Sequence, residues 1–118
     1  MSRRNRPVDC PAPRAVAPLA DSERAAVVAL CRALADPTRL EIFRLIAAQE
    51  APLCVCDIVE RFDRQQPTVS HHLRVLWEAG LVRPSRHGVW VYYAVDPEGL
   101  RRLARLGASV LEGAVPSH

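Results

Sequence analysis

Apolar residues recur every three or four positions over most of the chain, which is the spacing of a helix with one buried face. The first such stretch follows Asp21 and Ser22, either of which suits the N-cap position of a helix. Prolines then indicate further helix starts, because the first residue of a helix does not use its N–H group within the helix. The pattern predicts helices over 22–35, 37–48, 52–62, 67–79 and 97–112, the last four starting at Pro37, Pro52, Pro67 and Pro97.

Between Gly80 and Asp96 the apolar spacing changes to two, which is the period of a β-strand. Gly80 suits the position directly after a helix, where a left-handed backbone is common. The residues that follow predict a β-hairpin with a basic tip at Arg86, His87 and Gly88. The expected fold is therefore mainly α-helical with a single β-hairpin.

Composition divides the chain and indicates a compartment. Four of the ten prolines lie within the first 18 residues, so residues 1–20 are expected to form a flexible arm before one domain over 21–112 and a tail over 113–118. No apolar run is long enough for a membrane helix, and no signal segment follows the basic start. We therefore expect a cytoplasmic protein whose cysteines are thiols, metal ligands or redox sensors. The net charge of +3 permits nucleic-acid binding without requiring it.

Helix 52–62, the connection DRQQ and helix 67–79 have the lengths of a helix-turn-helix, in which the second helix enters the major groove of DNA. The predicted apolar stripe of the second helix is Val69, Leu73, Leu76 and Trp77. His72, beside this stripe, is interpreted as structural. Side chains able to donate hydrogen bonds to phosphates or bases occupy the remaining positions and the hairpin. The candidate DNA-binding residues are Gln66, Thr68, Ser70, His71, Arg74, Arg83, Arg86 and His87.

Four separated segments carry recognisable motifs in a fixed order. They are LADPTRLEIFRLI (34–46), PLCVCDIV (52–59), QQPTVSHHLRVLWEAGLV (65–82) and RHGVWVYYAV (86–95). Together they resemble the ArsR/SmtB family of metal-responsive transcriptional repressors. The resemblance implies a winged helix-turn-helix homodimer that binds double-stranded operator DNA, with the first and last helices at its two-fold interface. One departure is Gln65, which stands where the family usually has a serine that caps the DNA-reading helix.

Cys54 and Cys56 stand one residue apart at the predicted start of helix 52–62. On a regular helix their side chains would point about 200° apart. Binding of one ion by both sulfurs therefore requires a turn that is not fully helical. A helix N-terminus favours thiolates, and thiolates bind soft ions. The pair is a candidate metal site that lacks at least one ligand.

Cys10 and Cys31 are the remaining cysteines and the candidates for a third thiolate. Cys31 lies in the apolar pattern of the first helix, where a free cysteine often packs as a small hydrophobic residue. Related arsenite repressors often carry their third cysteine at the position of Val59, whereas cadmium- and lead-binding members recruit arm cysteines, commonly from the other subunit. The resemblance thus implies a site of Cys10, Cys54 and Cys56 with the arm crossing the dimer. Two alternatives stay open: Cys31 as the third ligand in place of Cys10, and binding of Cys10 to the cysteine pair of its own chain.

Three thiolates without a fourth donor suit trigonal As(III) or Sb(III), whereas Cd(II) and Zn(II) favour four ligands. The implied function is a repressor that leaves its operator when As(III) or Sb(III) binds. Two alternatives keep the repressor but give it a Cd(II), Pb(II) or Zn(II) signal, or a thiol-oxidation signal. A winged helix used only for protein contacts is a further alternative. An enzyme is not expected, because the spacing is not Cys-x-x-Cys and no nucleophile–base pattern appears. No organic cofactor and no membrane partner are expected.

Overall fold

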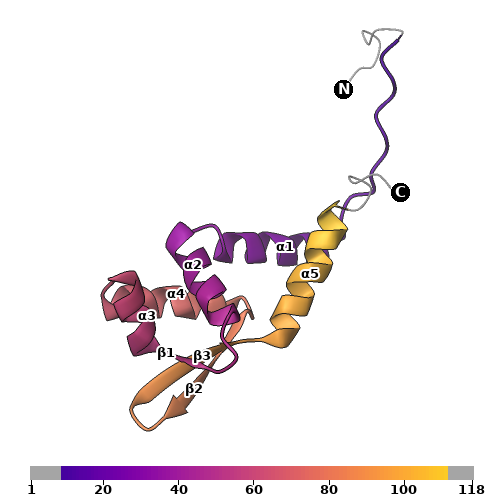
Figure 1. Cartoon of the computed structure of the whole chain (residues 1–118). Helices are drawn as coiled ribbons and strands as arrows, with labels where there is room; N and C mark the ends of the chain where they lie inside the picture. Colours follow the sequence, from indigo (N-terminus) through magenta and orange to yellow (C-terminus); the bar gives the residue numbers. More distant parts are fainter. Residues whose placement is uncertain (1–8, 112–118) are drawn as a thin grey trace.

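The computed structural model describes residues 9–111 and arranges them as helices around a small sheet (Figure 1). The helices are Asp21–Ala33 (α1), Pro37–Ala47 (α2), Val55–Phe62 (α3), Gln66–Glu78 (α4) and Pro97–Leu111 (α5). The strands are Leu53–Cys54 (β1), Val82–His87 (β2) and Trp90–Val95 (β3). The predicted mainly helical fold with one hairpin is confirmed. The expected tail over 113–118, residue 112 and residues 1–8 of the expected arm lie outside the described residues.

Two of the proline-marked helix starts are confirmed together with their caps. Pro37 is the first residue of α2, and the Asp36 carboxylate accepts a hydrogen bond from the Arg39 backbone N–H at 3.0 Å. Pro97 is the first residue of α5, and the Asp96 carboxylate accepts from a backbone N–H in the first turn of that helix. Each aspartate satisfies a donor that the start of a helix leaves without an intrahelical partner.

Two other helix starts differ from the expectation. Residue Ala20 occupies the N-cap of α1 and provides no side-chain cap, whereas Asp21 is the first helical residue and pairs with Arg24. In α4 the proline is the second helical residue, because the helix begins at Gln66. Gln65 is its N-cap and makes no side-chain capping bond, in line with the departure noted in the sequence.

Strand β1 corrects the expected helix start at Pro52. Leu53 and Cys54 pair with Tyr93 and Tyr92 of β3 in an antiparallel ladder. The backbone is therefore extended where the sequence predicted a first helical turn, and α3 begins at Val55. Proline fixes only its own φ, and this value is compatible with an extended chain as well as with a helix.

The hairpin of β2 and β3 forms the wing, and its turn consists of Gly88 and Val89. His87 pairs with Trp90 across the turn, and Gly88 has a φ of +65°, a left-handed value that glycine adopts without strain. Arg86 and His87 are thus the last residues of β2 rather than the turn itself. The sheet order is β1-β3-β2, so β3 lies between the wing edge and the strand that leads into α3.

The core lies where α1, α2, α3 and α4 pack against one another and against the start of β2. Its buried members are Leu30, Ala33, Ile42, Phe43, Ile46, Ile58, Val69, Leu73, Leu76, Leu81 and Val82. The predicted stripe on α4 is confirmed for three residues and is wrong for Trp77, which is 51% exposed. Cys31 is also exposed in the single chain, so the buried face of α1 consists of Leu30 and Ala33.

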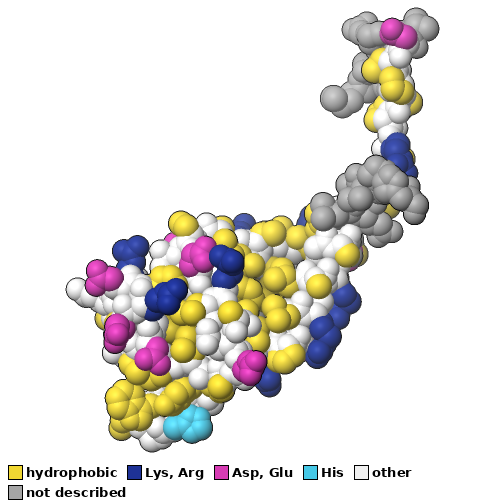
Figure 2. Space-filling model, viewed as in Figure 1, with side chains coloured by type: hydrophobic (Ala, Val, Ile, Leu, Met, Phe, Trp, Pro, Cys, Tyr) yellow, Lys and Arg dark blue, Asp and Glu magenta, His cyan; other side chains and the backbone are white. Residues whose placement is uncertain are grey.

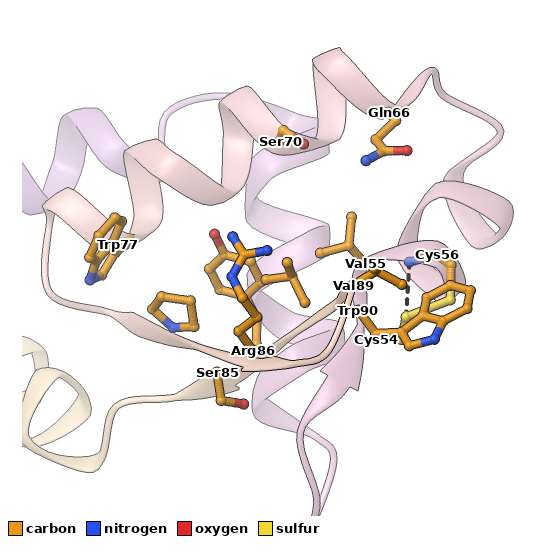
Figure 3. A pocket seen from close by; sticks show the side chains of 13 residues that line it. Cys54, Val55, Cys56, Gln66, Ser70, Trp77, Ser85, Arg86, Val89 and Trp90 are labelled. Carbon is orange, nitrogen blue, oxygen red and sulfur yellow. Dashed lines mark hydrogen bonds between the residues drawn. A yellow bond between two sulfur atoms is a disulfide. The ribbon is translucent and has the colours of Figure 1, made fainter.

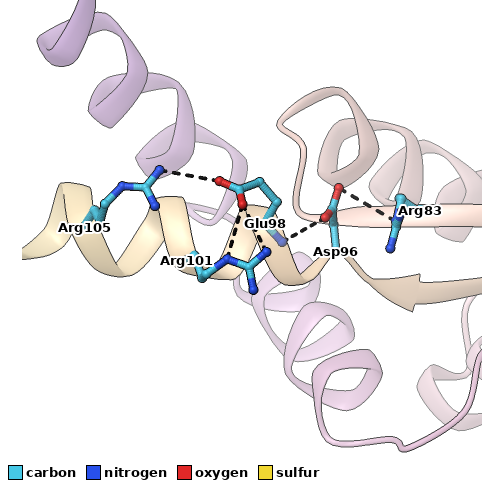
Figure 4. A network of polar contacts seen from close by, with 5 residues as sticks. All are labelled: Arg83, Asp96, Glu98, Arg101 and Arg105. Atoms are coloured by element: carbon cyan, nitrogen blue, oxygen red, sulfur yellow. Dashed lines mark hydrogen bonds and ion pairs between the residues drawn. The ribbon is translucent and has the colours of Figure 1, made fainter.

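Asp96 joins the base of the wing to α5 (Figure 4). One of its carboxylate oxygens accepts from the Glu98 N–H at 3.0 Å, and the other lies 3.9 Å from the Arg83 Nε atom. Glu98 in turn pairs with Arg101 and Arg105 at 3.1 and 3.6 Å, and the hydrogen bonds from Arg101 hold the pKa of the Glu98 carboxyl below its usual range. The wing base and the first turns of α5 therefore share one chain of polar contacts.

Candidate DNA interface and cysteine pair

Helices α3 and α4 form a helix-turn-helix whose turn is set by Asp63. This residue follows α3 with a left-handed φ of 49°, and the Arg64 N–H donates to the Val59 carbonyl behind it. Such a cap ends a helix sharply and turns the chain toward the next one. Burial of one face of α4 then leaves the opposite face available to DNA.

The structure exposes all the candidate DNA-binding residues except Ser70, which is half-buried. Three of them, Gln66 and Ser70 on α4 and Arg86 on the wing, line one open groove. Figure 3 shows Arg86 below α4, with Gln66 and Ser70 above it. Helix α4 and the wing thus border the same groove, and the assignment of these residues to DNA binding stays a prediction. The remaining candidates are exposed without lining the groove: Thr68, His71, Arg74, Arg83 and His87.

Two of the wing candidates have partners within the chain. The Arg83 guanidinium lies near Asp96 at the wing base, and its side chain is still 63% exposed. The His87 ring stands edge-on to the Tyr92 ring, with centroids 5.1 Å apart. Tyr92 is also the backbone partner of Cys54. A contact path of three residues therefore runs from the cysteine pair to a candidate DNA contact on the wing.

The cysteine pair lies at the junction of β1 and α3. Cys54 is the N-cap of α3 and has an extended backbone (φ −68°, ψ 140°), which turns its sulfur toward Cys56. The Cys54 Sγ atom accepts a hydrogen bond from the Cys56 backbone N–H at 3.4 Å. The two sulfurs are joined as a disulfide, with Cα atoms 5.2 Å apart. Cys54 is buried and Cys56 is exposed. The expectation that a break in helical geometry lets both sulfurs converge is confirmed, although a strand produces the break.

Cys10 and Cys31 are free and exposed. Cys10 lies in the segment before α1, which Figure 1 shows leaving the body near the far end of α5, on the side away from β1. Within residues 9–111 of one chain, no three histidine, cysteine, aspartate or glutamate side chains gather as a metal site. The structure brings together two of the three predicted ligands, and once their disulfide is reduced both are soft sulfur donors suited to a thiophilic ion.

Sequence reasoning missed the apolar part of the groove beside the cysteines. Val55, Val89, Trp90 and Tyr93 line it together with both cysteines, and the groove encloses about 570 Å³. Trp90 is 55% exposed, which is unusual for so large an apolar side chain. The sequence offered one signal, because strand alternation directs the neighbouring Tyr92 and Tyr93 to opposite faces and so keeps the aromatic residues of β3 from all facing the core.

A polar cluster of Arg39, His72 and Asp36 joins α4 to α1 and to the start of α2. The Arg39 guanidinium donates to the carbonyls of Arg32 and Ala33 at the end of α1 and to His72 Nδ1 at 3.2 Å. Burial lowers the pKa of His72, and the Arg39 backbone N–H lowers the pKa of Asp36. His72 is buried within the fold, which agrees with its interpretation as a structural residue.

The family model described as "Bacterial regulatory protein, arsR family" matches residues 36–83, which hold α2, the helix-turn-helix and the start of the wing. The chain is 37% identical over 75 residues to an HTH-type transcriptional regulator of Methanocaldococcus jannaschii, a match that spans 64% of this chain and 83% of the relative. It is 36% identical over 90 residues to a cadmium resistance transcriptional regulatory protein CadC homolog of Staphylococcus aureus. This match spans 76% of this chain and 74% of the relative. The chain belongs to the arsR family.

Other arsR-family proteins extend this comparison. The arsenical resistance operon repressor of Escherichia coli K12 is 41% identical over 70 residues, which is 59% of this chain and 59% of the repressor. The solution structure of a homodimeric winged helix-turn-helix domain of Mycobacterium bovis, a possible ArsR-family regulator, has a TM-score of 0.60 at 29% identity, covering 87% of this chain and 96% of that one. This arsR-family chain is a winged helix-turn-helix transcriptional regulator that acts on DNA, and not an enzyme. None of the helices within residues 9–111 could span a membrane.

Proposed function

We propose that this arsR-family regulator is a homodimeric repressor that leaves its operator when As(III) or Sb(III) binds Cys54, Cys56 and Cys10. The observation that carries the proposal is the position of Cys54. Its backbone pairs with Tyr92 of the wing in the β-ladder, its side chain caps the first helix of the helix-turn-helix, and it lines the groove between the wing and α4. One residue thus belongs to the strand that pairs with the wing, to the cap of α3 and to the lining of the groove beside α4.

The mechanism follows from this junction. The sulfurs bind an ion only after the disulfide is reduced, and the ion then fixes the distance between them, because each metal–sulfur bond is about 2.3 Å long. Moving Cys54 displaces β1 relative to Tyr92 and shifts the N-terminus of α3. Both changes alter the angle between the wing and α4. A hundredfold loss of DNA affinity requires about 2.7 kcal/mol of coupling, which is an ordinary allosteric value.

The geometry of the arm supports Cys10 as the third ligand. Ten residues separate Cys10 from Asp21 at the start of α1, and a fully extended chain of that length reaches roughly 35 Å. Because this segment leaves the body on the side away from its own cysteine pair, a site in the partner chain is the favoured target. The names of related proteins, an arsenical repressor and a cadmium regulator, support a thiophilic inducer.

The surface between α1 and α5 supports the homodimer. The two helices pack together, and Val28 on α1 and Val110 on α5 are 39% and 49% exposed. Figure 2 shows hydrophobic side chains gathered on this face of the molecule, between the two helices. A two-fold axis at this surface would present two copies of α4 to successive major grooves, about 34 Å apart.

Arsenite titration of the DNA complex tests the proposal. The protein is reduced with a phosphine, and a duplex that it selects from a random pool carries the fluorophore. Arsenite should lower DNA affinity about a hundredfold for wild type and should leave Cys54→Ser, Cys56→Ser and Cys10→Ser bound. Cys31→Ser is the matched control and should respond as wild type does. Release from Cys54→Ser or Cys56→Ser would overturn the proposal, and loss of the response in Cys31→Ser would move the third ligand to that residue.

The disulfide between Cys54 and Cys56 favours a second candidate, a thiol-redox signal at the same junction. Oxidation joins the two sulfurs and reduction separates them, so the junction of β1 and α3 would change without any ion. DNA release by peroxide that dithiothreitol reverses, in metal-free buffer, would support this candidate. Equal DNA affinity of the oxidised and reduced protein would exclude it.

A further inference from the structure

The C-terminal end of the DNA-reading helix α4 is held by α5, the helix that follows the wing. The Arg102 guanidinium of α5 donates a hydrogen bond to the Ala79 carbonyl at 2.5 Å, and Ala79 is the C-cap of α4. The sequence of the last turn of α4 contains no basic residue. A cation at this end of a helix stabilises the carbonyls that have no intrahelical partner. Arg102 thus supplies from another element the cation that α4 lacks.

Backbone contacts beside Arg102 leave the junction of α4 and α5 little freedom. The Asp96 N–H donates to the Leu81 carbonyl at 2.9 Å, directly before α5 begins. A Cβ atom on Gly99 would fall on the Gly80 carbonyl oxygen, so the backbone of α5 lies against the chain that leaves α4. A Cβ atom on Gly80 would come within 2.9 Å of the Arg102 guanidinium. The end of α4 and the first turns of α5 are therefore closely packed.

Packing alone does not account for Arg102. The residue is half-buried, and its Nε atom is buried without a hydrogen-bond partner among residues 9–111. A buried donor without a partner lowers stability, and an apolar side chain of similar size avoids this cost. Proteins break this rule chiefly at functional sites.

A small rotation at the junction of α4 and α5 would move the N-terminal end of α4 by a full base-pair step. The 13 residues of α4 span about 20 Å, and the N-terminal residues of a reading helix are those that contact bases. A rotation of about 10° at the C-terminal end would shift the N-terminal end by about 3.5 Å, close to the rise of one base pair. Helix α5 packs against α1 at the proposed two-fold interface. The angle between α4 and α5 therefore determines how far apart the two copies of α4 lie in a dimer.

We infer that Arg102 is a positioning residue that sets the separation of the two copies of α4, and hence the number of base pairs between the operator half-sites that the regulator accepts. Arg102 acts through Ala79, at the end of α4 opposite the residues that would read bases. The inference rests on the homodimer of the proposed function. It does not depend on the cysteine pair or on any inducer.

Operators of different spacing test the inference. Reduced wild type selects a palindromic duplex from a random pool, and this duplex is remade with one base pair added to or removed from its centre. Wild type should bind the altered duplexes about tenfold more weakly, because its two reading helices no longer bind as a linked pair. Arg102→Met keeps an apolar side chain of similar length but removes the charge and the donor, and its preference for one spacing should fall below about threefold. Arg102→Lys, which keeps a charge and a donor, should restore most of the preference.

A duplex with a single half-site separates positioning from a general structural role. Wild type and Arg102→Met should bind it with affinities that agree within about twofold, because the reading surface itself is unchanged. Arg101→Met, at the exposed neighbouring position, is the matched control and should keep the wild-type preference. An unchanged preference in Arg102→Met, or an equal loss of affinity for the single half-site and for every spacing, would overturn the inference.

Two further outcomes have a definite meaning. Circular dichroism measures the helix content of each variant, and Arg102→Gln replaces Arg102→Met if the latter does not fold. The same loss of spacing preference is then expected, and an unchanged preference would again overturn the inference. A wild type that binds all spacings and the single half-site equally well would overturn the homodimeric complex of the proposed function, and this inference with it.

Discussion

At the scale of single residues, His72 shows how a buried polar group fixes the DNA-reading helix. Arginine can only donate hydrogen bonds, so the contact from Arg39 requires His72 Nδ1 to be an unprotonated acceptor. The other ring nitrogen lies 4.0 Å from the Asp36 carboxylate. The neutral imidazole therefore joins α4 to the helix start that Asp36 caps, and protonation would break the contact with Arg39.

This arrangement predicts a loss of stability in mild acid. The pKa of His72 is lowered by burial from its ordinary value of 6.5, so the unfolded chain binds a proton that the folded chain does not. The contribution of His72 is complete above pH 6.5 and is lost as the pH falls below that value. Asp36, whose pKa is also lowered from 3.8, loses its contribution only in stronger acid.

Urea unfolding at pH 7.5 and pH 5.5 measures the effect. Wild type should be less stable at pH 5.5, and His72→Gln should show a smaller difference between the two pH values. His71→Gln, at the exposed neighbouring position, should keep the wild-type difference. An equal difference in wild type and His72→Gln would mean that another group titrates.

Gly99 illustrates a second constraint at the residue scale. A Cβ atom at this position would fall on the Gly80 carbonyl oxygen and would come within 3.1 Å of the Leu81 Cα atom, both of them backbone atoms. Gly99→Ala should therefore cost about 1–3 kcal/mol of unfolding free energy, as overpacking does. Gly107→Ala, on the same helix with open space around it, should instead stabilise by about 0.5–1 kcal/mol. Thermal or urea unfolding of the two variants measures whether each substitution lowers or raises the free energy of unfolding.

At the scale of elements, α4 and the wing contribute differently to DNA binding. Arg74 on α4 and Arg86 on the wing are both exposed, whereas Arg44 on α2 pairs with Glu41 at 2.9 Å outside the candidate interface. If each of the first two contacts a phosphate, its removal should weaken binding to all sequences alike and reduce the salt slope of log K by about one.

Fluorescence anisotropy over a range of salt concentrations tests this expectation for Arg74→Ala, Arg86→Ala and Arg44→Ala. The first two should show the smaller slope, and the third should match wild type. A change confined to one DNA sequence would instead indicate a base contact. An unchanged slope in all three would remove both arginines from the phosphate interface.

The elements that the sequence predicted are those whose signal is local. The period of α4, the aspartate–proline starts of α2 and α5, and the alternation along β3 each appear within a few consecutive residues. Strand β1 is two residues long, and its partner lies nearly forty positions away at Tyr92 and Tyr93, so no local pattern marks it. Trp77 kept the helical period of the stripe but lies near the end of α4, where the core gives way to the open groove.

In the candidate site, too, the sequence predicted what depends on neighbouring residues and missed what depends on the folded chain. Residue types alone identified Cys54 and Cys56 as a soft-ligand pair, and spacing showed that a regular helix could not bring their sulfurs together. The apolar groove beside them was missed because it forms only when the wing folds back against β1. Trp90 and Cys56 are far apart in sequence, and no periodicity relates them.

At the scale of the whole molecule, the exposed apolar surface of α1 and α5 makes the formation of a homodimer the central prediction. Val28 lies on α1, whose opposite face is buried through Leu30 and Ala33. Placing a charge at Val28 in a dimer interface would bury an unpaired carboxylate, which costs several kcal/mol, whereas the same charge on a monomer stays in water. Val28→Glu should therefore dissociate the dimer without unfolding the chain.

Sedimentation velocity and circular dichroism together test this consequence. Val28→Glu should sediment as a monomer with wild-type helix content, and its operator affinity should fall because the two copies of α4 no longer bind as a linked pair. Val28→Ala removes only two methyl groups and should stay dimeric.

The Val28→Glu variant also tests where the arm binds. If Cys10 ligates across the dimer, Val28→Glu should lose its third sulfur for arsenite while it keeps the Cys54–Cys56 pair. X-ray absorption on the arsenite-loaded proteins should then count three sulfurs for wild type and two for Val28→Glu. Three sulfurs in the monomer would place the arm on its own chain.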